Sequence, residues 1–396
     1  MIPLRRGLVA AFVLGLGLSI TLSQTALTLL TLLWLWTLRD PETRRMALRP
    51  LWQPILAFSA VSLLSALGSE HARASVIASK GLLLSAALYV TANALTESRA
   101  AERFLSGLVL VATIAAVIGL LQASLCPGPA PDYGPPAWLY HRCFRARGSF
   151  SIYMTLAGVL TLVLLASFPR LILAGALRGW LAPLWLVMLG GLLATYTRGA
   201  WVGFAAGMLA LLPTSRRMRW VLIGGLLLLV TGAFVGPPHL RQRFFTIADR
   251  DDPTVKERIY MWRSGVAIWR EHPWLGVGPG GVKREYPHYA LPEASKKKTS
   301  HVHNTPLQIL IERGVVGLSA WLWIWGAFYM RGVRLFRRLA SEAVRDRALV
   351  AGSLAAITGF LVAGLFEYNF GDSEVVMVAW VMLALPFIVE RQARAS

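Results

Sequence analysis

Long runs of apolar residues, separated by short polar links, are the feature that most restricts how this chain can fold. A membrane-spanning helix needs roughly 20 such residues, and only 15% of the 396 residues are charged while 56% are hydrophobic. That composition is typical of a membrane protein rather than of a soluble domain. We therefore predict an all-α polytopic membrane protein with about twelve transmembrane helices. The expected spans lie near residues 7–38 (two helices, broken at the sequence TLSQT), 51–67, 76–95, 104–125, 149–167, 179–197, 199–213, 220–235, 306–330, 348–366 and 375–390.

Basic residues concentrate in alternate links between these runs. If the N terminus is cytoplasmic, the inner links and the two termini hold 21 of the 40 Lys and Arg residues, as the positive-inside rule requires of short loops. This pattern predicts that both termini are cytoplasmic. The net charge of +20 then mainly reflects how the chain is oriented in the membrane. We expect membrane lipids as partners but no nucleic acid, because no soluble domain carries a basic face with interleaved aromatic residues.

Residues 236–305 are the most polar stretch of the chain, and we predict that they form one large periplasmic loop domain between the ninth and tenth helices. Residues 1–235 then hold helices one to nine, and residues 306–396 hold helices ten to twelve. The two cysteines, Cys126 and Cys143, fall in another outer loop. An oxidising compartment would allow a disulfide between them, and two separate thiols are the alternative. No cleavable signal peptide is evident.

Two histidines stand directly before the apolar run that begins at residue 306. In an extended segment His301 and His303 point to the same side, and Pro306 predicts a helix start just after them. The positive end of a helix keeps a nearby imidazole neutral, as a general base requires, and favours bound anions. A histidine that only forms interfacial hydrogen bonds is the alternative. We expect no metal, because a third ligand at a recognisable spacing is missing among Glu285, His288 and Glu293.

A second helix is predicted in the polar stretch, with Asp252 as its N-cap and Pro253 in its first turn. Arg258 projects into the apolar face of this helix, where a guanidinium is costly unless an anion meets it. Arg258 is therefore a candidate either for substrate binding or for a structural ion pair. Arg263 lies at the edge of the same face and is a secondary candidate. The acidic run at 249–252 could hold a divalent cation, although turn and capping roles already explain it.

Further candidates lie at the other outer boundaries. Arg198 sits in a tight turn between two apolar runs, a depth at which charges are usually functional or paired, although its side chain could instead extend to the lipid headgroups. Arg147 belongs to an interfacial arginine cluster. The last outer turn, FEYNFGDSE, supplies three carboxylates of which one is a candidate to orient a histidine: Glu367, Asp372 and Glu374.

Three ordered motifs give the chain a family resemblance. His303-Asn304, followed after nine residues by Gly314-Val-Val-Gly317, resembles the His–Asn/Ser/Gln–x9–Gly-x-x-Gly signature of bacterial O-antigen ligases. The sequence ERIYMWRSGVAIWREHPWLGVGPGGV resembles the segment that precedes this signature in the ligase and polymerase superfamily. TYTRGAWVGF resembles the arginine-bearing turn of the same superfamily. With the expected layout of spans, these motifs cover most of the chain.

The resemblance implies a metal-free and cofactor-free glycosyltransferase of the bacterial inner membrane, with its active site on the periplasmic face. The donor would be a polysaccharide on undecaprenyl diphosphate, and the acceptor a terminal sugar of lipid A–core. The essential histidine of the family matches His303, with His301 as its neighbour, and its diphosphate-binding arginines match Arg198 and Arg258. Secondary site candidates are Arg263, Arg147, Asn304 and Asp372.

Three other functions stay open. An O-antigen polymerase shares the donor and the layout but elongates the glycan on its carrier; the histidine signature favours the ligase. A protein-glycosylating oligosaccharyltransferase of the superfamily is less expected because the C terminus is short. A lipid-linked oligosaccharide flippase belongs to a different class, and transporters tend to show matched halves and polar residues at mid-membrane, whereas here the unusual polar residues gather at one face.

Overall fold

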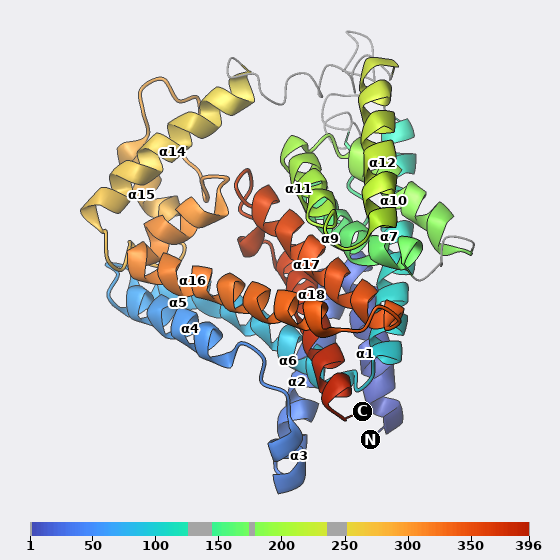
Figure 1. Cartoon of the computed structure of the whole chain (residues 1–396). Helices are drawn as coiled ribbons and strands as arrows, with labels where there is room; N and C mark the ends of the chain where they lie inside the picture. Colours follow the sequence, from blue (N-terminus) through green and yellow to red (C-terminus); the bar gives the residue numbers. More distant parts are fainter. Residues whose placement is uncertain (1, 126–144, 174–178, 236–251, 396) are drawn as a thin grey trace.

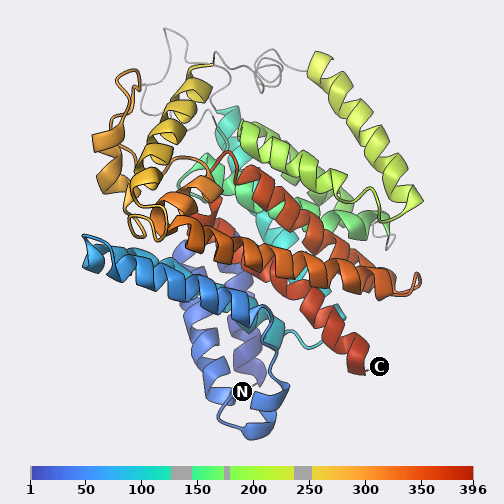
Figure 2. The same ribbon diagram turned by 60° about the vertical axis from the view of Figure 1, so that its left-hand side comes forward.

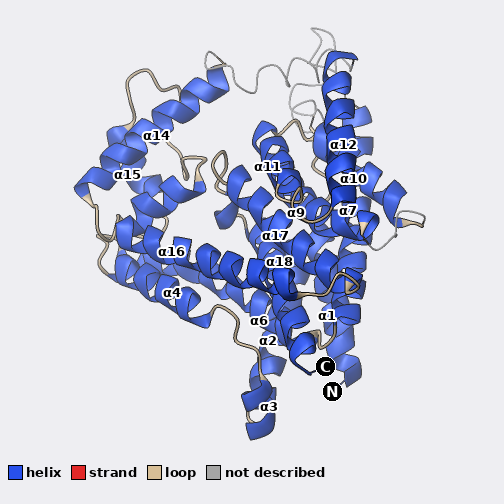
Figure 3. Cartoon of the chain, viewed as in Figure 1, coloured by secondary structure: helices blue, strands red, loops and turns tan. Residues whose placement is uncertain are grey.

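The computed structural model describes residues 2–125, 145–173, 179–235 and 252–395, and within these ranges the chain forms helices and loops without any strand (Figures 1 and 3). The predicted all-α class is confirmed. Cys126 and Cys143 lie outside the described residues.

The helices are α1 Ile2–Leu18, α2 Ile20–Thr37, α3 Pro41–Met46, α4 Trp52–Leu67, α5 Ala72–Ala78, η1 Ser79–Ser85, α6 Ala86–Ala94, α7 Ser98–Ser124, α9 Tyr153–Ile172, α10 Leu181–Ala194, α11 Arg198–Leu209, α12 Arg216–Val235, α14 Pro253–Glu271, α15 Val282–Tyr289, α16 Thr305–Arg338, α17 Val344–Ala363, η3 Asn369–Gly371 and α18 Ser373–Ala395.

Seven helical segments in the described part of the chain are long and apolar enough to cross a membrane. Two shorter apolar helices, α4 and α10, accompany them. The protein is thus a multi-pass membrane protein. The count of twelve spans, and the place of the polar stretch between the ninth and tenth of them, stay predictions. The seven segments are 20–37, 72–94, 98–124, 153–172, 305–338, 344–363 and 373–394.

The first apolar run breaks earlier than the sequence suggested. The break lies at Ser19, not at TLSQT, which forms the first turns of α2. Ser19 has an extended backbone, and its hydroxyl accepts a hydrogen bond from the Leu22 amide at 3.3 Å. A serine hydroxyl in this position satisfies one of the unpaired amides that every helix start exposes, so Ser19 is the cap of the new helix.

Helix α9 lies at the centre of the bundle, and 94% of the residues in its most apolar 18-residue stretch are buried. It packs against α7, α10, α11, α17 and α18. Small residues allow this close packing: a Cβ atom added at Gly352 of α17 would lie 2.2 Å from the Ala166 carbonyl oxygen of α9. In a lipid environment helices associate through such close van der Waals contact rather than through a hydrophobic driving force.

The two chain termini lie at one end of the molecule, and α14 and α15 lie at the opposite end, in both views (Figures 1 and 2). Helices α14 and α15 contact each other and α16. They share a small hydrophobic core with the segment that leads into α16, formed by the buried residues Met261, Ile268, Val282, Tyr286, Val302 and Ile311. This small core joins the polar stretch firmly to the start of α16, where the two histidines lie.

Candidate active site

The histidine segment is anchored to α16 by a helix cap. The Asn304 side chain accepts a hydrogen bond from the Leu307 amide at 2.9 Å and donates to the Leu365 carbonyl at 3.0 Å. The Thr305 hydroxyl donates to the Glu367 carbonyl at 2.9 Å. The predicted helix start is therefore confirmed, and Asn304 has a capping role. The same contacts connect this helix start to the loop between α17 and η3, which is distant in sequence.

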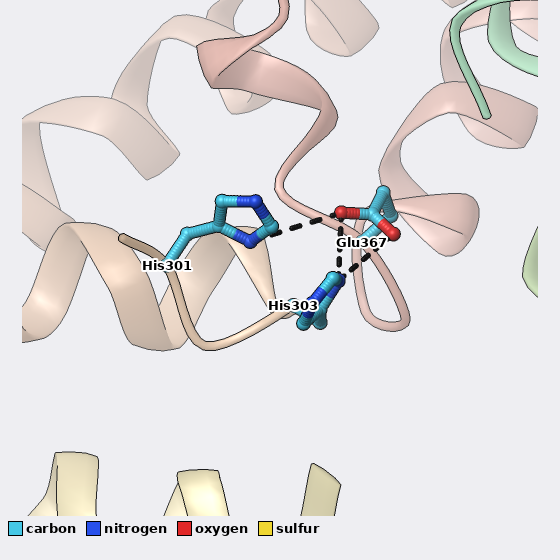
Figure 4. A group of neighbouring side chains, drawn as sticks. All are labelled: His301, His303 and Glu367. Atoms are coloured by element: carbon cyan, nitrogen blue, oxygen red, sulfur yellow. Dashed lines mark hydrogen bonds and ion pairs between the residues drawn. The ribbon is translucent and has the colours of Figure 1, made fainter. Parts of the chain in front are cut away.

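His303 and Glu367 form the centre of the site (Figure 4). The His303 Nδ1 atom lies 3.0 Å from each carboxylate oxygen of Glu367. Burial by itself would raise the pKa of Glu367, but the hydrogen bond and the charge of His303 lower it below its usual value. An ionised carboxylate only accepts hydrogen bonds, so this contact directs an Nδ1 proton of His303 at Glu367. When the ring is neutral, its Nε2 lone pair is free to accept a proton.

The backbone of His303 is also unusual. Its φ angle is +50°, in the left-handed region that non-glycine residues seldom adopt. Such conformations cost of order 1–3 kcal/mol and persist only where surrounding contacts hold them. Here the cap at Asn304 and the carboxylate of Glu367 hold the residue on either side. The ring is thus fixed before any substrate arrives.

Of the three carboxylates in the last turn, Glu367 alone joins the histidines among the described residues. Asp372 accepts hydrogen bonds from the Thr155 hydroxyl at 2.6 Å and from the Val375 amide at 3.2 Å. It therefore caps the start of α18 and connects this helix to α9. The sequence suggested that one of these carboxylates orients a histidine, and the structure selects Glu367.

His301 lies beside this pair. Its Nδ1 atom is 4.0 Å from Glu367 Oε1, and its ring centre is 4.3 Å from that of His303. The two histidines therefore point to the same side, as the extended segment predicted. Burial, followed by the charge of His303, lowers the pKa of His301. His301 Nδ1 is buried and has no hydrogen-bond partner among the described residues.

Arg258 reaches the same carboxylate from α14. Its guanidinium Nη2 lies 3.8 Å from Glu367 Oε2, and one quarter of the side chain is exposed. Burial, and to a lesser extent the charge of Arg198, lower the pKa of Arg258. A buried guanidinium is costly unless an anion meets it. Glu367 supplies part of that compensation for Arg258. The most buried positions of α14 are Met261, Ser264, Gly265 and Ile268, whereas its tryptophans are half-buried.

Arg198 opens α11 and faces Asp252, the N-cap of α14. Two hydrogen bonds of 3.0 and 3.1 Å join the guanidinium to the two carboxylate oxygens, which is the bidentate geometry that arginine makes best. Burial acts to raise the pKa of Asp252, but Arg198 overcomes this and lowers it to about 2. The structure thus brings both predicted arginines to one region, each against a carboxylate.

Two secondary candidates lie apart from this cluster. Arg263 is exposed on α14, and no contact in the described part of the chain joins it to the histidines. Arg147 donates from Nη1 to the Ser151 carbonyl at 3.2 Å, in the loop before α9. Its backbone amide donates to Gln122 Oε1 at 3.3 Å, which ties this loop to α7.

A buried polar network behind the histidines was missed from the sequence. The Val302 amide donates to Gln308 Oε1 at 2.9 Å, and Gln308 Nε2 donates to Glu312 Oε1 at 2.8 Å. Glu312 also accepts from the Gly280 amide at 2.9 Å and pairs with Arg313 at 2.9 Å. Because leaving a buried partner unpaired costs about 1–3 kcal/mol, this network holds the histidine segment in place. The spacing of Gln308 and Glu312, one helical turn apart, was the only sequence signal for it.

The structure explains why the first position of the Gly314-Val-Val-Gly317 motif is a glycine. It adopts φ +63° and ψ −171° inside α16 and produces a kink there. A Cβ atom at this position would lie 2.0 Å from the Trp274 carbonyl oxygen, because the loop after α14 crosses the helix at this point. Only glycine adopts this backbone conformation without strain. The motif therefore allows the loop from α14 to lie against α16.

We expect Gly314→Ala to lower the free energy of unfolding by about 1–3 kcal/mol, because both the backbone strain and the overlap must be relieved by movement. Gly326→Ala is the matched control, since Gly326 lies in the same helix and a Cβ atom there would meet nothing within 4 Å. Thermal unfolding in detergent measures both variants. Equal unfolding temperatures would contradict the role given to the kink.

The histidines and Glu367 also have a composition suited to a metal ion. One ligand atom of each residue lies within 4.8 Å of the others, the only such group in the described ranges. The carboxylate comes from Glu367 and not from the three residues considered in the sequence. A set of two histidines and one glutamate is typical of zinc.

A cavity of about 230 Å³ adjoins the site between α4, η1, α16 and α18. Ser300 and Tyr368, the neighbours of His301 and Glu367, line it together with Arg313 and other polar residues. Apolar side chains line it as well, among them Ile55, Phe58, Leu82, Leu84, Ile324, Phe370, Val376 and Trp380. The cavity thus places an apolar wall next to the histidine cluster.

Comparison with known proteins agrees with this geometry. Residues 183–322 match the family model described as O-antigen ligase; this range contains both arginines and both histidines of the site. No curated protein matches the chain. The family match, together with the multi-pass helical fold, supports a similarity to the O-antigen ligase/polymerase superfamily.

Proposed function

We propose that this protein is an O-antigen ligase, which transfers a polysaccharide from undecaprenyl diphosphate to a sugar hydroxyl of lipid A–core. The single observation that carries the proposal is the placing of His303, whose Nδ1 is held by Glu367 beside two arginines. The reaction occurs at the periplasmic face of the bacterial inner membrane, with both termini cytoplasmic. The periplasmic loop domain, residues 236–305, supplies Arg258 and the histidines, between membrane helices at residues 1–235 and 306–396.

His303 acts as the general base. With its proton on Nδ1 directed at Glu367, the Nε2 lone pair takes the proton of the acceptor hydroxyl as the acceptor oxygen bonds to the anomeric carbon. The bond from that carbon to the diphosphate oxygen breaks in the same displacement, and undecaprenyl diphosphate leaves. Direct displacement inverts the anomeric centre. Glu367 stabilises the imidazolium that forms, and His301 assists from the same side.

Arg198 and Arg258 bind the diphosphate. Arginine guanidinium groups match phosphate oxygens with paired, charge-assisted hydrogen bonds, so two of them can stabilise a leaving diphosphate without a divalent cation. In the described structure the carboxylates of Asp252 and Glu367 lie against these guanidinium groups. The donor diphosphate replaces them as the anion, and the start of α16 adds the positive end of its helix dipole.

The proposal is tested with purified protein in detergent that contains EDTA, undecaprenyl-diphosphate-linked glycan and lipid A–core. We expect a mass increase of lipid A–core that EDTA does not prevent, because the arginines perform the role of a metal. Loss of product in EDTA that returns with added Mg²⁺ would contradict the metal-free mechanism. A donor glycan that lengthens on its own carrier, while lipid A–core stays unmodified, would identify a polymerase.

The polymerase is the second candidate because the same base and arginines would serve it; only the acceptor differs. The signature formed by His303-Asn304 and Gly314-Val-Val-Gly317 favours the ligase. A flippase remains the candidate of another class, and it would move the lipid-linked glycan between leaflets of a vesicle without forming a new glycosidic bond. The assay above separates it from both enzymes, since no mass changes.

A further inference from the structure

We propose that His301, His303 and Glu367 bind one Zn²⁺ ion when no substrate is present, and that this ion reversibly inhibits the transfer. The three residues come from the entry to α16 and from the loop before η3, and their side chains converge (Figure 4). The inhibitory part of this inference rests on the proposed function. The binding part rests on the geometry of the three side chains alone.

The donor atoms are close to the arrangement that zinc requires. Zinc bonds to nitrogen and oxygen at about 2.0–2.2 Å in a tetrahedron, so neighbouring donors lie roughly 3.4 Å apart. Glu367 Oε1 lies 3.0 Å from His303 Nδ1 and 4.0 Å from His301 Nδ1. Small side-chain rotations therefore suffice. The three side chains are each partly exposed, so a water molecule can supply the fourth ligand.

His301 supplies an independent observation. Its Nδ1 atom points at Glu367 across 4.0 Å, a separation too long for a hydrogen bond, and it is buried without a partner in the described structure. A buried nitrogen with no hydrogen bond is costly. A zinc ion between this nitrogen and Oε1, which also accepts from the Tyr368 amide at 3.0 Å, would give the nitrogen a partner.

Arg258 limits the affinity but does not block the site. Its guanidinium lies 3.8 Å from Oε2, so Oε1 remains the oxygen available to an ion between the two rings. If the guanidinium of Arg258 moved closer, its hydrogen bond to Oε2 would be the outer contact that orients a ligating carboxylate. Mg²⁺ does not compete, because it prefers oxygen ligands and retains its water molecules.

Inhibition follows from the position of one proton. In the metal-free state the Nδ1 proton of His303 is directed at Glu367, and Nε2 is the base. Zinc takes the Nδ1 lone pair, so the single proton of the neutral ring must sit on Nε2. The ring then has no lone pair for the acceptor hydroxyl, and Glu367 is occupied as a ligand.

Equilibrium dialysis of the substrate-free protein against Zn²⁺ tests the binding, with the bound metal measured by mass spectrometry. We expect one ion per chain for the wild type and for His288→Ala, the matched control, whose histidine is exposed on α15. We expect at least a tenfold weaker affinity for both His301→Ala and Glu367→Gln, and no binding of Mg²⁺. Zinc should also raise the unfolding temperature of the wild type, since it binds the folded state; the same scan confirms that each variant is folded.

Absence of stoichiometric zinc, or binding that survives both ligand substitutions, would overturn the site. If zinc binds as expected, micromolar additions should inhibit the transfer, and EDTA should restore it. Transfer that continues at full rate with the site loaded would overturn the inhibition. Zinc binding without transfer under any condition would leave the metal site standing and contradict the proposed function instead.

Discussion

His303→Ala is expected to reduce the rate of transfer by about 10²–10⁴-fold, the usual contribution of a positioned general base. The substitution removes the one group whose Nε2 can accept the proton of the acceptor hydroxyl. Donor binding should change little, because the arginines remain. The rate is measured with purified protein, at saturating donor and acceptor, with EDTA present.

Two variants of Glu367 separate orientation from folding. Glu367→Gln should lower the rate substantially, since an amide can donate to Nδ1 and so favours the tautomer with its proton on Nε2. Glu367→Asp keeps the negative charge and should retain more activity than the glutamine variant. The control is again His288→Ala. A wild-type rate in folded His303→Ala would exclude this residue as the base.

Arg258→Ala is expected to lower kcat/KM for the lipid-linked donor by about 10²–10³-fold, the typical effect of losing one donor to a developing negative charge. Arg258→Lys should recover only part of this loss, because a lysine cannot make paired hydrogen bonds to phosphate. Arg270→Ala is the matched control, an exposed arginine three turns further along α14. The measurement is the rate as a function of donor concentration.

The ion pair between Arg258 and Glu367 requires one further comparison. If the arginine acted only by holding Glu367, Arg258→Ala would add nothing to the effect of Glu367→Gln in the double variant. If it binds the diphosphate, the two losses should combine, with a raised KM for donor that the glutamine variant does not show. Full coupling of the two substitutions would thus favour the structural ion pair that the sequence left open.

The sequence predicted those parts of the fold and site that depend on local chemistry. Apolar run lengths gave the all-α membrane class, Asp252 marked the start of α14, and Pro306 marked the start of α16. Helical periodicity placed Arg258 on an apolar face of α14, but the most buried positions of this helix are Met261, Ser264, Gly265 and Ile268. The break at Ser19 was not, because several polar residues in that run can cap a helix and packing chooses among them.

Pairings between distant residues were beyond local reasoning. Glu367 was one of three equal carboxylates in the sequence, and it meets His303 only because α17 returns the chain to the start of α16, 64 residues later. Likewise, nothing near Asp252 indicates that it faces Arg198, 54 residues away. The sequence of this protein determined by itself which segments are helices and which residues are chemically unusual, since both follow from short-range spacing and solvation. Only the tertiary structure decided which of those residues meet, because hydrogen bonds act over about 3 Å and such proximity is set by how the helices pack.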